Sequence, residues 1–124
     1  MRINRLSTHA LQNLINGKVK ENQTCVLKFY SNGCHMCHAL SPYFKDIAES
    51  EEHGDLHFFA FNVDDFPDIE KMLKFKGVPT IFVVHTHVDN RLPTMRMMPD
   101  PSDPSEKTWY KTNDIRSFIK KEAL

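Results

Sequence analysis

The sequence has no long apolar run and no excess of charge of one sign. No stretch of 18 apolar residues occurs, so a transmembrane helix is not expected. The N-terminal segment MRINRLSTHALQNL lacks the apolar core and cleavage site of a secretory signal. Sixteen basic residues balance sixteen acidic ones, so no general attraction to nucleic acid or to a membrane surface is expected. We therefore expect a cytoplasmic protein without nucleic-acid or membrane partners, and we expect it to be a monomer.

Cysteine is scarce, with three among 124 residues. A chain of this length can bury a core without disulfide staples, and an odd number of cysteines does not suit a disulfide framework. A reducing compartment and one working cysteine pair fit this pattern better. We predict a single domain over residues 1–124, in which Cys25, inside an apolar run, is buried and has no chemical role.

Hydrophobic periodicity predicts alternating helices and strands. Apolar residues at helical spacing indicate helices near residues 7–15, 34–50, 66–75 and 113–124. Short aromatic and β-branched runs indicate strands near 24–31, 56–63, 76–87 and 107–112. This order predicts an α/β fold with a mixed sheet of four or five strands flanked by helices.

Two cysteines lie in the run CHMCH, which covers Cys34 to His38. The predicted elements place them at the start of a helix, directly after a buried strand. Unpaired N–H groups and the positive end of the helix dipole favour a thiolate there, and a protonated His35 would add to the effect. Cys34 is predicted to attack a disulfide, and Cys37, one helical turn later, to resolve the mixed disulfide.

Other chemistries fit the same run. Cys34, Cys37 and His38 satisfy the C-x-x-C-H pattern of covalent haem attachment, although no export signal accompanies them. Two thiolates with His35 or His38 could bind zinc, or two chains could share an iron–sulfur cluster. His85 and His87 alternate on a strand, but surface histidines are commoner than metal sites. Thiol exchange needs no cofactor, and we assign none.

Three segments together resemble the thioredoxin family: VLKFYSNGCHMCHALSPYFKDIA, the strand that ends in FNVDD, and GVPT. The resemblance implies a thioredoxin-like fold and a thiol-disulfide oxidoreductase that acts on disulfide-containing protein substrates, with a reductase or a small thiol as electron donor. Pro79 matches the family's cis-proline beside the cysteine pair. The backbone around Val78, Pro79 and Thr80 would then present a surface with which an extended substrate can pair.

The chain departs from the family pattern around the cysteines. Gly33 stands where thioredoxins usually have tryptophan, and His35 and Met36 replace Gly-Pro between the cysteines. Lys28 replaces a buried acidic residue, and Ala60 replaces a lysine on the next strand. These four changes predict an altered redox potential and substrate choice, with Lys28 attracting thiolates rather than repelling them. A non-catalytic binding module of the same fold, or one with a metal site at the cysteine pair, is the alternative hypothesis.

The connection over residues 88–107 contains four of the seven prolines. A loop of this length in a compact domain is usually functional or mobile. Because the resemblance places Pro79 at the start of the third strand, near the cysteines, we expect the turn that follows this strand to point away from them.

Overall fold

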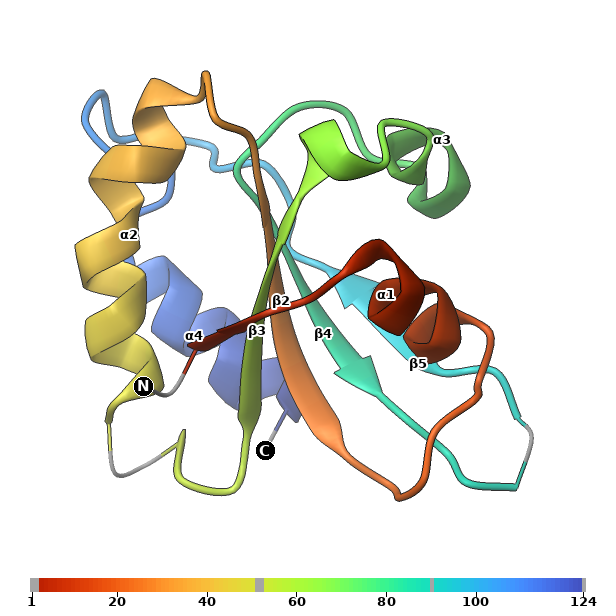
Figure 1. Cartoon of the computed structure of the whole chain (residues 1–124). Coiled ribbons are helices and arrows are strands. Elements are labelled where there is room, and N and C mark those ends of the chain that lie inside the picture. The colour runs from red at the N-terminus through yellow and green to blue at the C-terminus, as the bar shows by residue number, and fades with distance from the viewer. Residues whose placement is uncertain (1–2, 51–52, 90, 124) are drawn as a thin grey trace.

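The computed structural model describes residues 3–50, 53–89 and 91–123 (Figure 1). Over these residues it contains five strands, β1 (Ile3–Arg5), β2 (Thr24–Tyr30), β3 (His57–Asn62), β4 (Thr80–His85) and β5 (Thr94–Met97). The helices are α1 (Thr8–Ile15), α2 (His35–Ala48), α3 (Ile69–Leu73) and α4 (Thr112–Ala123), and the short 3-10 helix η2 covers Val63–Asp65. None of the helices in these ranges is long and apolar enough to cross a membrane.

The strands form one mixed sheet in the order β1-β3-β2-β4-β5. The pairs β1–β3 and β3–β2 are parallel, whereas β2–β4 and β4–β5 are antiparallel. The predicted α/β fold with a mixed sheet is confirmed. The sequence did not predict β1, because three residues at a sheet edge are too few to show a pattern of alternation.

Helices cover both faces of the sheet (Figure 1). The core under α2 and α4 includes Leu40 and Ile115 of the helices and Val26 of β2. The core under α1 and α3 includes Leu11 and, from β2, Leu27. Successive residues of a strand point to opposite faces, so β2 contributes to both cores and reads as a continuous apolar run. Lys28 interrupts that run on the α2 side.

The prediction of a strand at residues 107–112 is wrong. Trp109 has φ 66°, a left-handed conformation that a strand does not accommodate. Backbone hydrogen bonds of 3.0 and 2.9 Å join Ser105 and Trp109 in both directions, and the Thr108 hydroxyl donates to the Tyr110 carbonyl at 2.8 Å. The segment folds on itself because these local bonds replace a strand ladder.

The strand that follows β4 in the chain is instead β5, which lies inside the segment over residues 88–107 that was expected to be a loop. Its side chains are mostly exposed, so the apolar pattern that identifies a strand is weak. Residues 86–89, which follow the C-terminal end of β4, lie at the end of the sheet away from α2's N-terminus, as expected for the turn after this strand (Figure 1). Because β5 runs antiparallel to β4, residues 98–107 return toward the start of β4. The expectation that the segment after the third predicted strand points away from the cysteines is therefore wrong for residues 98–107.

Candidate active site

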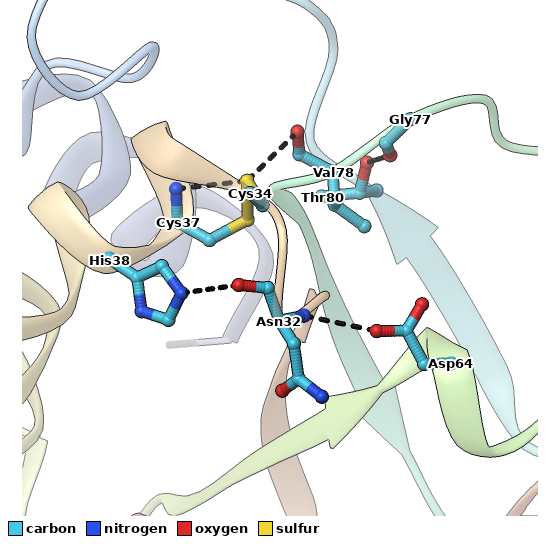
Figure 2. The surroundings of a disulfide bond; sticks show 8 residues. All are labelled: Asn32, Cys34, Cys37, His38, Asp64, Gly77, Val78 and Thr80. Carbon is cyan, nitrogen blue, oxygen red and sulfur yellow. Dashed lines mark hydrogen bonds between the residues drawn. A yellow bond between two sulfur atoms is a disulfide. The ribbon is translucent and has the colours of Figure 1, made fainter.

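Cys34 and Cys37 lie at the N-terminus of α2, where β2 has just ended (Figure 2). They form a disulfide, with 5.2 Å between their Cα atoms. Cys34 is the N-cap residue of α2, and the backbone N–H of Cys37 donates to the Sγ atom of Cys34 at 3.0 Å. After reduction, the same N–H group and the helix dipole would stabilise a Cys34 thiolate.

The two sulfurs differ in access. Cys34 is partly exposed, whereas Cys37 is only 2% exposed. An approaching sulfur atom can therefore reach Cys34 more easily than Cys37. Gly33 and His35 are exposed beside it, and a Cβ atom added to Gly33 would meet nothing within 4 Å. No close packing requires glycine there, so its effect is to leave open the space that a larger residue would fill.

The segment Gly77–Thr80 lies next to the disulfide (Figure 2). The Val78–Pro79 peptide bond is cis, and the Val78 carbonyl oxygen lies 3.6 Å from Sγ of Cys34. The Thr80 hydroxyl donates to the Gly77 carbonyl at 2.8 Å, and Thr80 pairs with Phe29 of β2. The end of the sheet thus holds the Val78 backbone beside the more accessible sulfur.

A groove of about 410 Å³ adjoins this segment. Met36 lines it on the α2 side and Pro79 at the start of β4, while Asp100 and Trp109 come from the returning segment after β5. The sequence prediction missed Asp100 and Trp109. No local pattern could have identified them, because only the antiparallel return of β5 brings residues so distant in sequence to the groove.

Polar contacts hold the turn before Cys34. Nε2 of His38 lies 2.8 Å from the Asn32 carbonyl oxygen, which can only accept, so Nε2 carries the proton and donates (Figure 2). The Asn32 backbone N–H donates to Oδ2 of Asp64 at 3.1 Å, and the Asn62 side-chain amide donates to Oδ1 of Asn32 at 2.9 Å. The role of His38 shown here is to support the turn, a role that the sequence did not predict.

His85, one of the two alternating histidines near the end of β4, is also held by hydrogen bonds. Nε2 of His85 donates to the Glu122 carbonyl at 2.9 Å, which fixes Nδ1 as an acceptor for the Thr24 hydroxyl at 3.1 Å. These bonds tie β4 to α4 and β2. Within residues 3–50, 53–89 and 91–123, no three His, Cys, Asp or Glu side chains gather as a possible metal site.

Lys28 lies on β2 below α2, beside Ala60 in the adjacent strand β3. It is only 5% exposed, and burial lowers the pKa of its ammonium to about 8. Its Nζ atom is 4.9 Å from the centre of the Phe44 ring. Lys28 and Cys37 line the same cavity.

Cys25, the third cysteine, is fully buried on the opposite face of the sheet, in the core under α1. Burial raises the pKa of its thiol to about 12. A thiol that stays protonated at neutral pH is a poor nucleophile, so the chemistry is confined to Cys34 and Cys37.

Comparisons with known proteins agree with this geometry. The family model Thioredoxin matches residues 5–121. Thioredoxin-3, mitochondrial, of Saccharomyces cerevisiae is 29% identical over 62 residues, which are 50% of this chain and 47% of that protein. Thioredoxin of Mycoplasma genitalium is 32% identical over 66 residues, which are 53% of this chain and 63% of that protein. The matches thus span less than two thirds of either relative. Among solved structures, the Trx4 domain of ERdj5 has a TM-score of 0.72 at 15% identity and covers 100% of this chain and 99% of that one, which shows a shared fold.

Proposed function

Because the chain belongs to the thioredoxin family, we propose that it is a thiol-disulfide oxidoreductase that exchanges disulfides in protein substrates through Cys34 and Cys37. The observation that carries the proposal is the asymmetry of the pair. Cys34 is accessible and receives the Cys37 N–H at 3.0 Å, while Cys37 is buried directly behind it. This is the arrangement that an attacking thiolate and a resolving thiol require.

In the proposed reaction, the Cys34 thiolate attacks one sulfur of a substrate disulfide. A mixed disulfide forms, and the other substrate sulfur leaves as a thiolate that takes up a proton. Cys37 then loses its proton and attacks Sγ of Cys34, which releases the second substrate thiol. The substrate gains two electrons, and the protein is left with the Cys34–Cys37 disulfide seen in this structure. A reductase or a small thiol would return two electrons to the protein.

We place the substrate backbone along Val78. Its carbonyl oxygen is 3.6 Å from Sγ of Cys34, so an extended segment that pairs with Val78 would bring its own sulfur close to the attacking atom. Pro79 and Thr80 are buried and hold this edge in position. The groove between Met36 and Trp109 would receive the flanking substrate side chains.

The test is disulfide reduction in insulin with dithiothreitol as electron donor, combined with trapping of adducts. Cys34→Ser should abolish reduction, and Cys37→Ser should accumulate a mixed disulfide visible by non-reducing electrophoresis and mass spectrometry. Cys25→Ala is the matched control and should retain reduction, because Cys25 is buried in another core. Equal loss in the first two variants without an adduct would contradict the assigned roles. An inactive parent protein would favour the non-catalytic binding module, and metal analysis of the same sample would test a metal or iron–sulfur site.

Location and assembly remain predictions. We propose a cytoplasmic monomer, supported by a single dithiol pair typical of reducing compartments and by the balanced charge. One relative named above is a mitochondrial protein. Cell fractionation with an antibody, together with light scattering of the purified chain, would test both parts.

A further inference from the structure

A second cavity lies on the inner side of the cysteine pair. It has a volume of about 330 Å³ and is lined by residues of β1, β2, β3 and α2, namely Ile3, Arg5, Lys28, Tyr30, Cys37, His38, Ser41, Lys45 and Ala60. It shares no lining residue with the groove at Val78 and Pro79. It is therefore a separate space from the groove in which we place the substrate.

The charges around this cavity are of one sign. Its lining contains the three cations Arg5, Lys28 and Lys45 and no carboxylate. Arg5 is partly compensated by Asp65, whose Oδ2 lies 3.2 Å from the guanidinium. In the described part of the chain, neither Lys28 nor Lys45 has a hydrogen-bond acceptor for its ammonium. Two uncompensated cations therefore border the same small cavity.

Lys28 is the unusual member of this set. An ammonium on a side chain that is 95% buried is costly unless an anion or another acceptor satisfies it. The Phe44 ring face, 4.9 Å from Nζ, supplies a cation–π contact but no acceptor. A carboxylate that entered the cavity would supply one through a charge-assisted hydrogen bond.

The other residues that line the cavity favour a ligand with an apolar part. Ile3, Ala60 and the Tyr30 ring form apolar walls between the cations. At about 30 Å³ for each water-sized group, the cavity has room for roughly ten non-hydrogen atoms. This is near the lower limit of typical ligand pockets.

We propose that this cavity binds a small organic monocarboxylate, whose carboxylate pairs with Lys28 while its apolar part lies against Ile3, Tyr30 and Ala60. Lys45 adds a second positive charge for the same group. Because Cys37 forms part of the wall, a bound carboxylate would share the cavity with the resolving cysteine. Such a site would let a small metabolite contact the redox centre from the side that protein substrates do not use.

The test uses the oxidised chain of residues 1–124 and two probes of matched shape, hexanoate and its neutral amide. Calorimetric titration should show that hexanoate binds about tenfold or more tightly than hexanamide, as expected for a hydrogen bond between charged groups. Amide chemical shifts should move at Cys37, Ser41 and Ala60. Equal affinity for the two probes, shift changes centred on Val78 to Thr80, or equally tight binding of inorganic phosphate would overturn the proposal.

Two variants and one control identify the site. Lys28→Met should reduce hexanoate affinity about tenfold, to that of hexanamide, because the charge is lost and the shape is kept. Ala60→Leu keeps the charge but fills the cavity, so it should abolish binding of both probes. Lys71→Met removes an exposed lysine of α3 outside the cavity and should change nothing. Unchanged hexanoate binding in folded Lys28→Met or Ala60→Leu would contradict the site. The measurement needs no turnover, so its failure would leave the proposed exchange reaction intact.

Discussion

Replacing Lys28 with methionine should stabilise the protein, although it removes a charged residue beside the active site. Burial lowers the pKa of Lys28 from 10.5 to about 8. This shift corresponds to about 3 kcal/mol by which the folded state disfavours the ammonium at neutral pH. The Phe44 ring offsets about 2 kcal/mol of this cost, the magnitude of a cation–π contact at a site removed from water. Because methionine matches the aliphatic stem, Lys28→Met should raise the free energy of unfolding by about 1–2 kcal/mol at pH 7.

The sign of the pH dependence follows from the lowered pKa. The unfolded chain holds the Lys28 proton up to about pH 10.5, whereas the folded chain releases it near pH 8. Unfolding therefore takes up a proton at Lys28 between these values, so the contribution of Lys28 to the stability of the parent protein rises with pH across this window. Below pH 8 the cost of the charge is present in full. The advantage of Lys28→Met should shrink by roughly 1 kcal/mol between pH 7 and pH 9.

Urea denaturation of the oxidised proteins, followed by circular dichroism at both pH values, measures this difference. Cys25 and Tyr110 also have shifted pKa values, both raised by burial, but they occur in both proteins and cancel in the comparison. Lys71→Met, on the exposed surface of α3, is the control and should change stability by less than about 0.5 kcal/mol. Equal stability of the parent and Lys28→Met at both pH values would refute the reasoning, since it would mean that the ammonium is as well solvated in the folded state as in the unfolded chain.

Three further predictions address the active site and the fold. The redox potential should fall in Lys28→Met and further in Lys28→Asp, by about 30 mV for every 1.4 kcal/mol of lost thiolate stabilisation, and equilibration with glutathione measures it. Unchanged potentials in both variants would exclude an effect of the Lys28 charge. Trp109→Gly suits the backbone at φ 66° but removes a side chain that lines the groove. KM for a protein disulfide should therefore rise several-fold, while reduction of a small disulfide is unchanged. An unaltered KM would restrict Trp109 to a role in folding. Gly17→Ala should lower the free energy of unfolding by about 1–2 kcal/mol or more, because φ at this position is +75° and the added Cβ atom would lie 2.7 Å from the Arg91 carbonyl oxygen. Gly33→Ala should leave the free energy of unfolding unchanged, because a Cβ atom there meets nothing within 4 Å. Equal melting temperatures of the two variants would contradict the close contact at Gly17.

The amino-acid sequence by itself determined the α/β alternation and the place of the cysteine pair. These features depend on interactions between residues close in the chain. The apolar run of β2 and the helical spacing of α2 are local patterns, and together they put Cys34 at a helix start, where it is found as the N-cap. The resemblance to the thioredoxin family, rather than a local pattern, placed Ala60 on the strand next to Lys28, and the two residues pair between β2 and β3.

Only the tertiary structure decided how the active site is enclosed. Strand β5 has mostly exposed side chains, so its place depends on pairing with β4 rather than on its own pattern, and that pairing brings Asp100 and Trp109 to the groove. The left-handed backbone of Trp109 is held by hydrogen bonds to Ser105, which no propensity of either residue predicts. The cavity behind Cys37 combines side chains from three strands and a helix, and only that assembly shows that the buried Lys28 lines the same cavity as Cys37. Local preferences are set by neighbours along the chain, whereas cavities and buried charges arise when distant segments pack against one another.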